Sequence, residues 1–599
     1  MSFDSSNHNF NVKICQMLVR TGDLEGNFKQ VIDEIHKMVE DEIELLVFPE
    51  TALTGYCCGA LWENVDFVVK QKQLLFEISI ALPFNRAVVI GFVNYLGQDT
   101  DGYPILTNSA AIINNGHISV YDKQLLATRD HHEDVKYFKA GTESKVFELI
   151  LWHGKIKIGV PICEDIWFKD HTRNIPEEMR RLGAEMLVSI NQSYFHYDKY
   201  EDRFNLAKGI VKTCRIPLVY VNAVGVGDIV KNIMIFDGGS FVMDTFEQVQ
   251  DHLARFMSES RKIHIDDILY VDSPKVDLPS NAFDKYDQIS SAIVFAQQEI
   301  FALSHIKRAQ VHLSGGIDSA VVAALSVCAE TGGETVFITN PSNENSPETK
   351  NYAMHVATKL CRPLYWEFIN ESIAALATTH MKAFKTDNVS GGVLTCAHAV
   401  GRTVMGLMAT HEFGTGIVPT ANHTEIVLGW ANFHDIGSIG VYAPIGDLTK
   451  TEIFELAEHI NAKAEDEIIP RQLYDGSLMP AAELPDAKFD PINYFLQSGI
   501  CANMIRLRMS KSQQMEAFVN KKLRLEYFKP LHVYGLDPEN IYAVYDVNPG
   551  EFSDALDYAY RKAKISVYKA AQGAPILILS PRSRGFSNRE TLFNLYREE

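Results

Sequence analysis

The feature that most constrains this 599-residue chain is an alternation of short β-rich runs with helical stretches. Between residue 11 and about residue 244 the runs are rich in branched and aromatic residues, as in NVKICQMLV, IELLVFPE and AVVIGFVNY. Helices are expected between them, at about residues 27–39 and 65–80. Near-continuous apolar runs are typical of strands covered on both faces. The pattern therefore predicts layered α/β structure and argues against a helical bundle.

A second α/β unit is expected to start near residue 288. The stretch before it, around residues 250–285, is charged and contains the proline-bearing segment DDILYVDSPKVDLPSNAFDKYDQ, which is typical of a linker. An apolar-periodic helix at about residues 289–303 and the segment AQVHLSGGIDSAVVAALSVCAE follow. We predict a first domain over residues 1–265, a linker over residues 266–287 and a second domain over residues 288–599.

Charge and composition argue against several classes of function. The 56 basic and 76 acidic residues give a formal charge of −20, which disfavours nucleic-acid coating and polybasic membrane binding. The nine cysteines form no CxxC motif or repeated metal-ligand spacing, which favours a reducing compartment. The chain has no long apolar run, and its first residues do not resemble a leader. We expect a soluble cytoplasmic protein with small-molecule substrates, no nucleic acid and no membrane partner.

Three chemically active residues each follow a predicted strand. Glu50 ends LLVFPE, Lys123 follows the run that ends in VYD, and Cys163 ends KIGVPIC. Each alone fits a commoner role: a capping carboxylate, a surface charge or a buried thiol. Strand ends of open α/β folds gather at one edge of the sheet, where a carboxylate can accept the thiol proton and an ammonium can stabilise an oxyanion. Together they predict a nucleophilic cysteine that cleaves a carbon–nitrogen bond through a thioester.

The segments FPET, YDKQLL and PICEDIW resemble, in this order, the three signatures of the nitrilase (carbon–nitrogen hydrolase) superfamily. The resemblance implies an α-β-β-α sandwich and a catalytic glutamate, lysine and cysteine at the three positions above. The segment SINQSYFHYDK is similar to a glutamine-binding segment of glutaminase members, which assigns Ser193 and Lys199 to glutamine binding. Glu164 matches a position that orients the substrate amine. Tyr194 stands where these glutaminases usually have proline.

The segment SGGIDSA follows a strand and opens a helix. Free N–H groups and the macrodipole at a helix start favour an anion, and the loop lacks the GK[ST] ending of loops that hold a γ-phosphate for hydrolysis. Ser314, Gly315, Gly316 and Ser319 are suited to cradling a pyrophosphate, while Asp318 can hold Mg²⁺. The predicted chemistry is adenylation with loss of pyrophosphate.

This loop resembles that of the ATP pyrophosphatases, the SGGxDS group. Within the group, VPTANHTEIVLGWANFHDIGSIGVYAPIGDLTKTE resembles a segment of the NAD synthetases. The resemblance implies a Rossmann-like parallel-sheet domain of the adenine nucleotide alpha hydrolase type. It also implies that Thr420 and Lys450 bind ATP, that Glu425 is a second Mg²⁺ ligand, and that Asp435 faces the nicotinate side of the dinucleotide.

Two further segments agree with the resemblance and two depart from it. The stretch NPSNENSPETK is similar to the loop over ATP and adds Ser342 to the ATP-binding residues, while Lys569 matches a lysine that meets deamido-NAD. The usual glutamine–alanine–arginine stretch is not clear in GGVLTCAHAVGR, and His423 replaces a lysine. The predicted contacts to deamido-NAD are therefore Asp435 and Lys569.

A nitrilase-type glutaminase ahead of an SGGxDS domain resembles the glutamine-dependent NAD synthetases. The resemblance implies glutamine, Mg-ATP and deamido-NAD as ligands, an enclosed passage for ammonia, and a homo-oligomer. One alternative is a related ligase that amidates another adenylated carboxylate, such as nicotinate mononucleotide. A binding or scaffold protein is the other alternative. It would need a broken triad or a missing loop aspartate, and the sequence has neither.

Overall fold

The computed structural model describes residues 10–128, 131–229, 231–265, 276, 282–431, 434–477, 493–529, 540 and 542–583. The chain forms two compact units that divide between Asp284 and Lys285, except that Val230–Ile233 groups with the second unit. Most of the predicted linker, residues 266–287, lies outside the described residues. The predicted domain boundaries stay predictions.

The first unit contains two six-stranded sheets, in the orders β14-β1-β2-β3-β4-β5 and β13-β12-β9-β8-β7-β6. The strands of the first sheet are β1 (Asn11–Gln16), β2 (Leu45–Val47), β3 (Ala87–Gln98), β4 (Pro104–Asn114), β5 (His117–Asp122) and β14 (Glu259–His264). Those of the second are β6 (Val146–Leu151), β7 (Gly154–Gly159), β8 (Met186–Asn191), β9 (Leu218–Asn222), β12 (Phe241–Met243) and β13 (Val249–His252). In both sheets three neighbouring strands run parallel, so their carboxyl ends lie at one edge.

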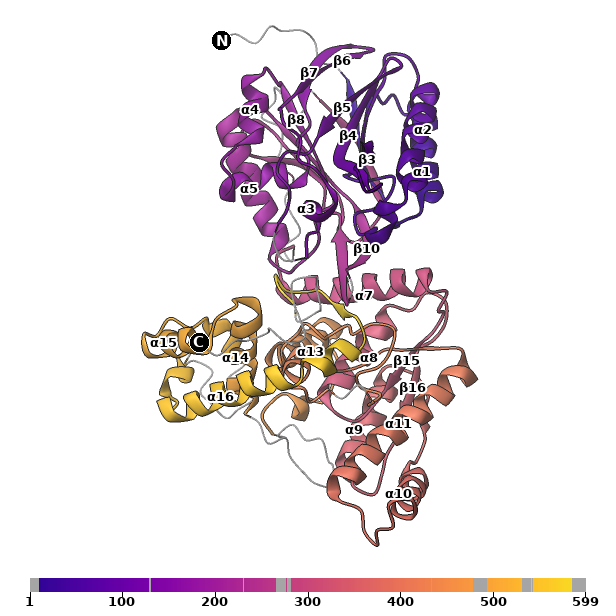
Figure 1. Ribbon diagram of the computed structural model, residues 1–599, viewed down its shortest axis with the longest axis vertical. Helices are drawn as coiled ribbons and strands as arrows, with labels where there is room; N and C mark the ends of the chain where they lie inside the picture. The colour runs from indigo at the N-terminus through magenta and orange to yellow at the C-terminus, as the bar shows by residue number, and fades with distance from the viewer. Residues whose placement is uncertain are drawn as a thin grey trace. The chain divides into compact units, whose positions relative to one another are not determined.

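Helices cover the outer faces of both sheets. Helices α1 (Leu24–Lys37) and α2 (Val65–Ala81) lie outside the first sheet, and α4 (Ile175–Arg181) and α5 (Lys199–Cys214) outside the second (Figure 1). Helix α1 begins three residues before the predicted start because the Asp23 side chain caps it by accepting the Gly26 N–H. The predicted α-β-β-α sandwich is confirmed.

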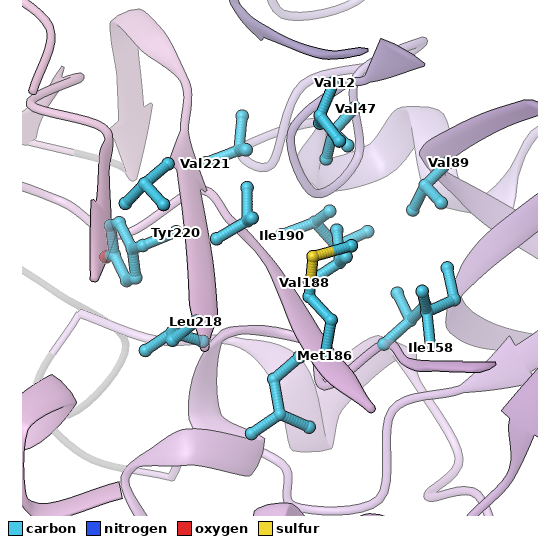
Figure 2. Packing of buried hydrophobic residues seen from close by; sticks show 14 of the residues in the cluster. Val12, Val47, Val89, Ile158, Met186, Val188, Ile190, Leu218, Tyr220 and Val221 are labelled. Carbon is cyan, nitrogen blue, oxygen red and sulfur yellow. The ribbon is translucent and has the colours of Figure 1, made fainter. Parts of the chain in front are cut away.

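The inner faces of the two sheets form one apolar core. Val12, Val47 and Val89 come from parallel strands of the first sheet, and Ile158 and Val188 from the second (Figure 2). All five side chains are almost completely buried. Burial of two such faces holds the layers together, and it fixes the strand ends that carry polar side chains.

The second unit contains a four-stranded parallel sheet of order β17-β16-β15-β18. Its strands are β15 (Ala309–His312), β16 (Val336–Thr339), β17 (Leu364–Trp366) and β18 (Gly416–Ile417). The helices that accompany it are α7 (Lys285–Leu303), α8 (Ile317–Cys328), α9 (Pro347–Lys359), α10 (Asn370–Phe384), α11 (Gly391–Phe413), α12 (His423–Leu428) and α13 (Lys450–Ala464). The order strand, glycine-rich turn, helix at β15 and α8 confirms the predicted Rossmann-like domain.

Helices near the carboxyl end of the described chain form a separate apolar core in the second unit. They are α14 (Tyr494–Arg506), α15 (Lys511–Val519) and α16 (Pro549–Ile565), followed by α17 (Val567–Gln572). The remaining α-helix and strands of the described chain lie outside this subdomain. They are α3 (Asp134–Tyr137) and β10 (Val224–Ile229) of the first unit, and the strands β11 (Asn232–Asp237) and β19 (Ile576–Leu577). Sequence analysis did not predict this helical subdomain.

Among the described helices, α11 alone has the length and composition that could cross a membrane. Core helices of globular proteins meet the same criterion. In α11, Arg402 Nη2 donates to Asp435 Oδ2 at 2.7 Å and Thr403 Oγ1 donates to the His434 carbonyl at 2.8 Å. These polar contacts fix the helix against a loop of the second unit.

Candidate active sites

Cys163 lies at the start of a one-turn 3-10 helix just beyond β7. Its φ of 42° is in the left-handed region, which costs a non-glycine residue about 1–3 kcal/mol. The Asp165 carboxylate holds this turn by accepting the backbone N–H groups of Ile162 (3.0 Å), Gln124 (3.0 Å) and Leu125 (2.8 Å). Because Gln124 and Leu125 directly follow Lys123, Asp165 joins the cysteine turn to the lysine segment.

The predicted glutamate and lysine form a buried ion pair. Lys123 Nζ lies 2.8 Å from Glu50 Oε1 and 2.8 Å from Asp134 Oδ2. Glu50 also accepts the Asn108 side-chain amide at 2.7 Å and the Gln192 backbone N–H at 2.7 Å. All three charged side chains are at most 1% exposed. A lysine at this depth requires compensating carboxylates, so the geometry fixes its charge and its position together.

A close backbone approach sets the position of Glu50. A Cβ atom on Gly91 of β3 would lie 2.5 Å from the Glu50 Cα and 2.4 Å from the Thr51 nitrogen. Only glycine leaves room for the chain to turn out of the sheet here.

The charges around Cys163 set its protonation state. Burial, and after it the charge of Glu50, raises the pKa of the Cys163 thiol well above its ordinary value, while Lys123 acts in the opposite direction. Burial would lower the pKa of Lys123, but Asp134 and Glu50 outweigh it and raise that pKa well above its usual range. The resting pair is therefore a thiol and an ammonium, and a reaction needs an acceptor for the thiol proton.

Asp134 is a member of this site that sequence analysis missed. Besides Lys123, it accepts the Tyr56 hydroxyl at 2.6 Å and the Ala127 N–H at 3.0 Å, and it is fully buried. In the sequence it lies in the charged stretch HHEDVK, which is typical of a solvent-exposed segment. No local signal separates such a carboxylate from a surface one, because its partners are distant in the sequence.

Glu164 and Lys199, the predicted glutamine-binding charges, lie near the cysteine. The charge of Glu164 raises the pKa of Cys163. Burial, and after it the charge of Arg203, lowers the pKa of Lys199, while Cys163 and Glu164 act in the opposite direction. Glu164 Oε1 lies 3.0 Å from His171 Nε2, and Lys199 Nζ lies 3.8 Å from the centre of the Trp167 ring. An acidic and a basic group thus stand beside the thiol, as the two ends of an amino acid require.

Ser193 lies in the loop that follows β8. Its N–H donates to Asn222 Oδ1 at 2.9 Å, and the preceding Gln192 donates its N–H to the predicted catalytic glutamate. Tyr194, in the position usually taken by proline, forms an isolated bridge with Phe236 of β11. The loop therefore stays attached to the sheet despite this departure from the family pattern.

The SGGIDS loop wraps around the start of α8. Gly315 has a φ of 83°, and a Cβ atom on it would lie 2.1 Å from the Thr349 carbonyl oxygen. Gly316 donates its N–H to Ser314 Oγ at 3.2 Å, and Ser319 Oγ donates to the Gly316 carbonyl at 2.9 Å. Glycine is thus required for the turn, and the two serines fold the loop around the helix start, where backbone N–H groups favour an anion.

Three predicted nucleotide-site residues converge next to this loop. Asn422 Nδ2 donates to Asp318 Oδ1 at 2.9 Å. Lys450 Nζ donates to the other Asp318 oxygen and lies 3.7 Å from Glu425 Oε1. Asp318, Glu425 and Lys450 stand at the starts of α8, α12 and α13. Two carboxylates that converge on one cationic atom supply the oxygen ligands that Mg²⁺ prefers.

Ser342 and Thr420 both lie just beyond strands of the parallel sheet. Ser342 follows β16, is buried, and donates its N–H to Asn345 Oδ1 at 2.8 Å. Thr420 follows β18 and donates its N–H to the Gly437 carbonyl at 3.0 Å. Both positions are at the carboxyl edge of the sheet, where ligands of open α/β folds bind.

The two predicted deamido-NAD contacts have protein partners. Asp435 pairs with Arg402 of α11 at 2.7 Å, and Lys569 Nζ donates to the Gly429 carbonyl at 2.9 Å. Sequence analysis did not assign Arg402 to the site, because the stretch around it departs from the family pattern. Burial lowers the pKa of His312, at the end of β15, to about 4, and the charges of Asp435 and Arg402 also act on it.

Comparisons with known proteins agree with this division of the chain. Residues 11–262 match the carbon-nitrogen hydrolase family model, and residues 289–526 match the NAD synthase family model. A glutamine-dependent NAD(+) synthetase from Acinetobacter baylyi is 27% identical over 80% of this chain and 84% of that protein. One from Synechocystis is 25% identical over 86% of this chain and 92% of that protein. A crystal structure of a glutamine-dependent NAD(+) synthetase from Cytophaga hutchinsonii has the same fold, with a TM-score of 0.77 at 18% identity over 98% of both chains.

The chain is thus an ATP-dependent ligase that carries a nitrilase-type domain. It belongs to the glutamine-dependent NAD(+) synthetases.

Proposed function

We propose that the chain makes NAD from deamido-NAD and ATP with nitrogen taken from glutamine. The observation that carries the proposal is the presence of two complete constellations in one chain. The first unit has a thiol beside a buried carboxylate–ammonium pair, and the second has a glycine-rich anion loop beside two convergent carboxylates. Either constellation alone would support only half of the reaction.

In the first unit, Glu50 is the base that takes the proton of Cys163, and the sulfur attacks the side-chain amide carbon of glutamine. The Lys123 ammonium stabilises the oxyanion, because Glu50 and Asp134 keep it charged. The proton on Glu50 passes to the leaving nitrogen, and ammonia departs. Glu50 then activates a water that hydrolyses the thioester and releases glutamate. Glu164, Ser193 and Lys199 hold the amino-acid end of glutamine.

In the second unit, the backbone of the SGGIDS loop receives the phosphates of ATP. Bound Mg²⁺, with Asp318 and Glu425 as ligands, would neutralise phosphate charge. Ser342, Thr420 and Lys450 hold ATP while Asp435 and Lys569 hold deamido-NAD. The nicotinate carboxylate attacks the α-phosphorus of ATP and displaces pyrophosphate, after which ammonia attacks the adenylate and displaces AMP. Positioning of the two substrates supplies much of the acceleration.

The proposal also includes self-association: the chain forms a homo-oligomer in the cytoplasm. Helix α11 exposes Val404, Leu407 and Met408, which lie on one helical face and are 48%, 45% and 62% exposed. An apolar face on a helix that also carries Arg402, the partner of Asp435, fits a homo-oligomer interface close to the dinucleotide site. Sedimentation at increasing protein concentration tests this, and a monomer at every concentration contradicts it.

One assay tests the reaction. Purified protein with Mg-ATP, deamido-NAD and glutamine should form NAD, AMP, pyrophosphate and glutamate in equal amounts. The Cys163→Ala variant should lose synthesis from glutamine but keep synthesis from a high concentration of ammonium salt. Loss of both activities in a folded Cys163→Ala variant would contradict two separate sites.

A further inference from the structure

A buried arginine, Arg203 of α5, contacts the loop that carries Ser193. Its Nη2 atom donates to the Ser193 carbonyl at 2.9 Å and, at 3.4 Å, to the Tyr194 carbonyl. Its Nη1 atom lies 2.8 Å from Asp237 Oδ1, and both side chains are fully buried. Arg255 Nε lies 3.0 Å from the second Asp237 oxygen. The proposed mechanism assigns none of these three charges a step.

Arg203 is one of several attachments that fix the loop. The amide of Asn222 holds Ser193 from one side, accepting its N–H at 2.9 Å and donating to its carbonyl at 3.3 Å. On the other side, Phe195 donates its N–H to the Ile235 carbonyl of β11 at 2.7 Å. Arg203 contacts the carbonyl groups of the loop: it shares the Ser193 carbonyl with Asn222, and it also donates to the Tyr194 carbonyl.

A guanidinium is suited to this position and an ammonium is not. Planar nitrogens can face an aspartate with one arm and two successive carbonyls with the other, whereas a lysine has one donor atom on a flexible stem. A buried cation requires a counter-charge, which Asp237 provides at the end of β11. Asp237 therefore fixes Arg203, and Arg203 fixes the loop.

We propose that Arg203, held by Asp237, is a positioning residue for glutamine. It holds the Ser193 segment in place, so that Ser193 can contact the amino-acid end of glutamine. This inference rests on the proposed function, because it assumes that Ser193 contacts glutamine. Arg203 touches no reacting atom. Its removal loosens the hold on the substrate and leaves the thiol and its base in place.

The test compares Arg203→Lys with a matched variant, Arg180→Lys. Arg180 of α4 also donates to two carbonyls of the first unit, those of Cys214 (3.0 Å) and Ala184 (3.1 Å), outside the glutamine site. Arg203→Lys should raise the KM for glutamine about tenfold, as expected for loss of a charged hydrogen bond, and should change kcat much less. Arg180→Lys should leave that KM unchanged. Synthesis from ammonium salt should be unchanged in both variants.

Two electrophiles separate positioning from general damage. A glutamine-like diazoketone should label Cys163 about tenfold more slowly in Arg203→Lys, whereas iodoacetamide, which has no amino-acid end, should label it at the wild-type rate. Equal slowing with both reagents, or an unchanged KM, overturns the proposal. If the wild type itself uses no glutamine, the proposed function has failed instead.

A second variant and a structure make the test independent of how Arg203→Lys folds. Asp237→Asn keeps the arginine but removes its counter-charge, so it should also raise the KM for glutamine. A crystal structure of the wild-type diazoketone adduct should show the amino-acid end beside Ser193. An adduct that points away from Ser193 overturns the inference whatever the variants do.

Discussion

Asn422 donates a hydrogen bond to Asp318 at 2.9 Å although 104 residues separate them in the chain. The same Asn422 side chain caps α12 by accepting the Glu425 N–H at 3.1 Å. One amide therefore connects the loop that carries the first proposed magnesium ligand with the helix that carries the second. The relative position of the two carboxylates is built into the fold before any ligand binds.

Charge-neutral variants should test this pair of carboxylates. Asp318→Asn and Glu425→Gln should each lower AMP formation at least about 100-fold, because an amide is a poor ligand for Mg²⁺ and leaves phosphate charge uncompensated. The loss should be the same with ammonium salt and with glutamine. AMP formation measured by chromatography near the wild-type level in both variants would remove the two residues from the site.

Labelling of Cys163 provides the control for those variants. The glutamine-like diazoketone should modify Cys163 in Asp318→Asn as fast as in the wild type, provided that the proposed glutaminase site is separate. A variant that loses both labelling and AMP formation is damaged as a whole and says nothing against the ligands.

Asp134 should be needed for fast glutamine hydrolysis, because it is a buried counter-charge of Lys123. Asp134→Asn removes one of the two carboxylates on Lys123, so the ammonium is less well fixed and the oxyanion less stabilised. We expect glutamate release to fall at least about tenfold, with synthesis from ammonium salt unchanged. Asp244→Asn is the matched control, because Asp244 is a buried carboxylate of the same unit that accepts the Phe246 and Gln248 N–H groups in a turn. An equal fall in the Asp244→Asn variant would point to general destabilisation.

The protonation state of Cys163 gives a prediction with a sign. Burial and Glu50 raise the pKa of the thiol, so iodoacetamide labelling of Cys163 should keep rising between about pH 6 and pH 9 without a plateau. Glu50→Gln removes a negative charge, which lowers that pKa and speeds labelling at a given pH, while glutamine hydrolysis is lost. Peptide mass spectrometry separates Cys163 from the exposed Cys328, Cys361 and Cys396. A plateau near neutral pH in the wild type would show that the thiolate already exists at rest.

The layered fold and the main site residues could be predicted from the sequence. Strand ends mark Glu50, Lys123 and Cys163 in the sequence. The structure groups them differently from the expected single sheet edge, because Glu50 and Lys123 follow strands of the first sheet and Cys163 follows a strand of the second. In the second unit, the glycine-rich loop pointed to Asp318, whereas Glu425 and Lys450 came from the resemblance to the NAD synthetases; all three stand at helix starts.

The residues that sequence analysis missed act through long-range contacts. In the sequence, Asp134 and Arg203 look like ordinary charged surface residues. The structure shows that both are buried, Asp134 against Lys123 and Arg203 against Asp237. Sequence periodicity indicates which face of an element is buried, but it does not indicate which charged residue from a distant part of the chain contacts that face. Arg402, the partner of Asp435, was missed for a different reason, because the stretch around it departs from the family pattern.

The choice between dinucleotide and mononucleotide substrate is the last prediction. Deamido-NAD should be amidated with a kcat/KM at least about 100-fold higher than nicotinate mononucleotide, because binding of the adenylate half can position the carboxylate against ATP. The Arg402–Asp435 pair lies in the predicted substrate region, so Asp435→Ala should reduce kcat/KM for deamido-NAD more than it weakens ATP binding.

Asp435→Ala also leaves Arg402 without its carboxylate. The double variant Asp435→Ala/Arg402→Met therefore separates a direct contact from an unpaired charge. If the double variant recovers activity, Asp435 only balances Arg402. Preference for the mononucleotide in the wild type would instead favour the related ligase that amidates a different adenylated carboxylate.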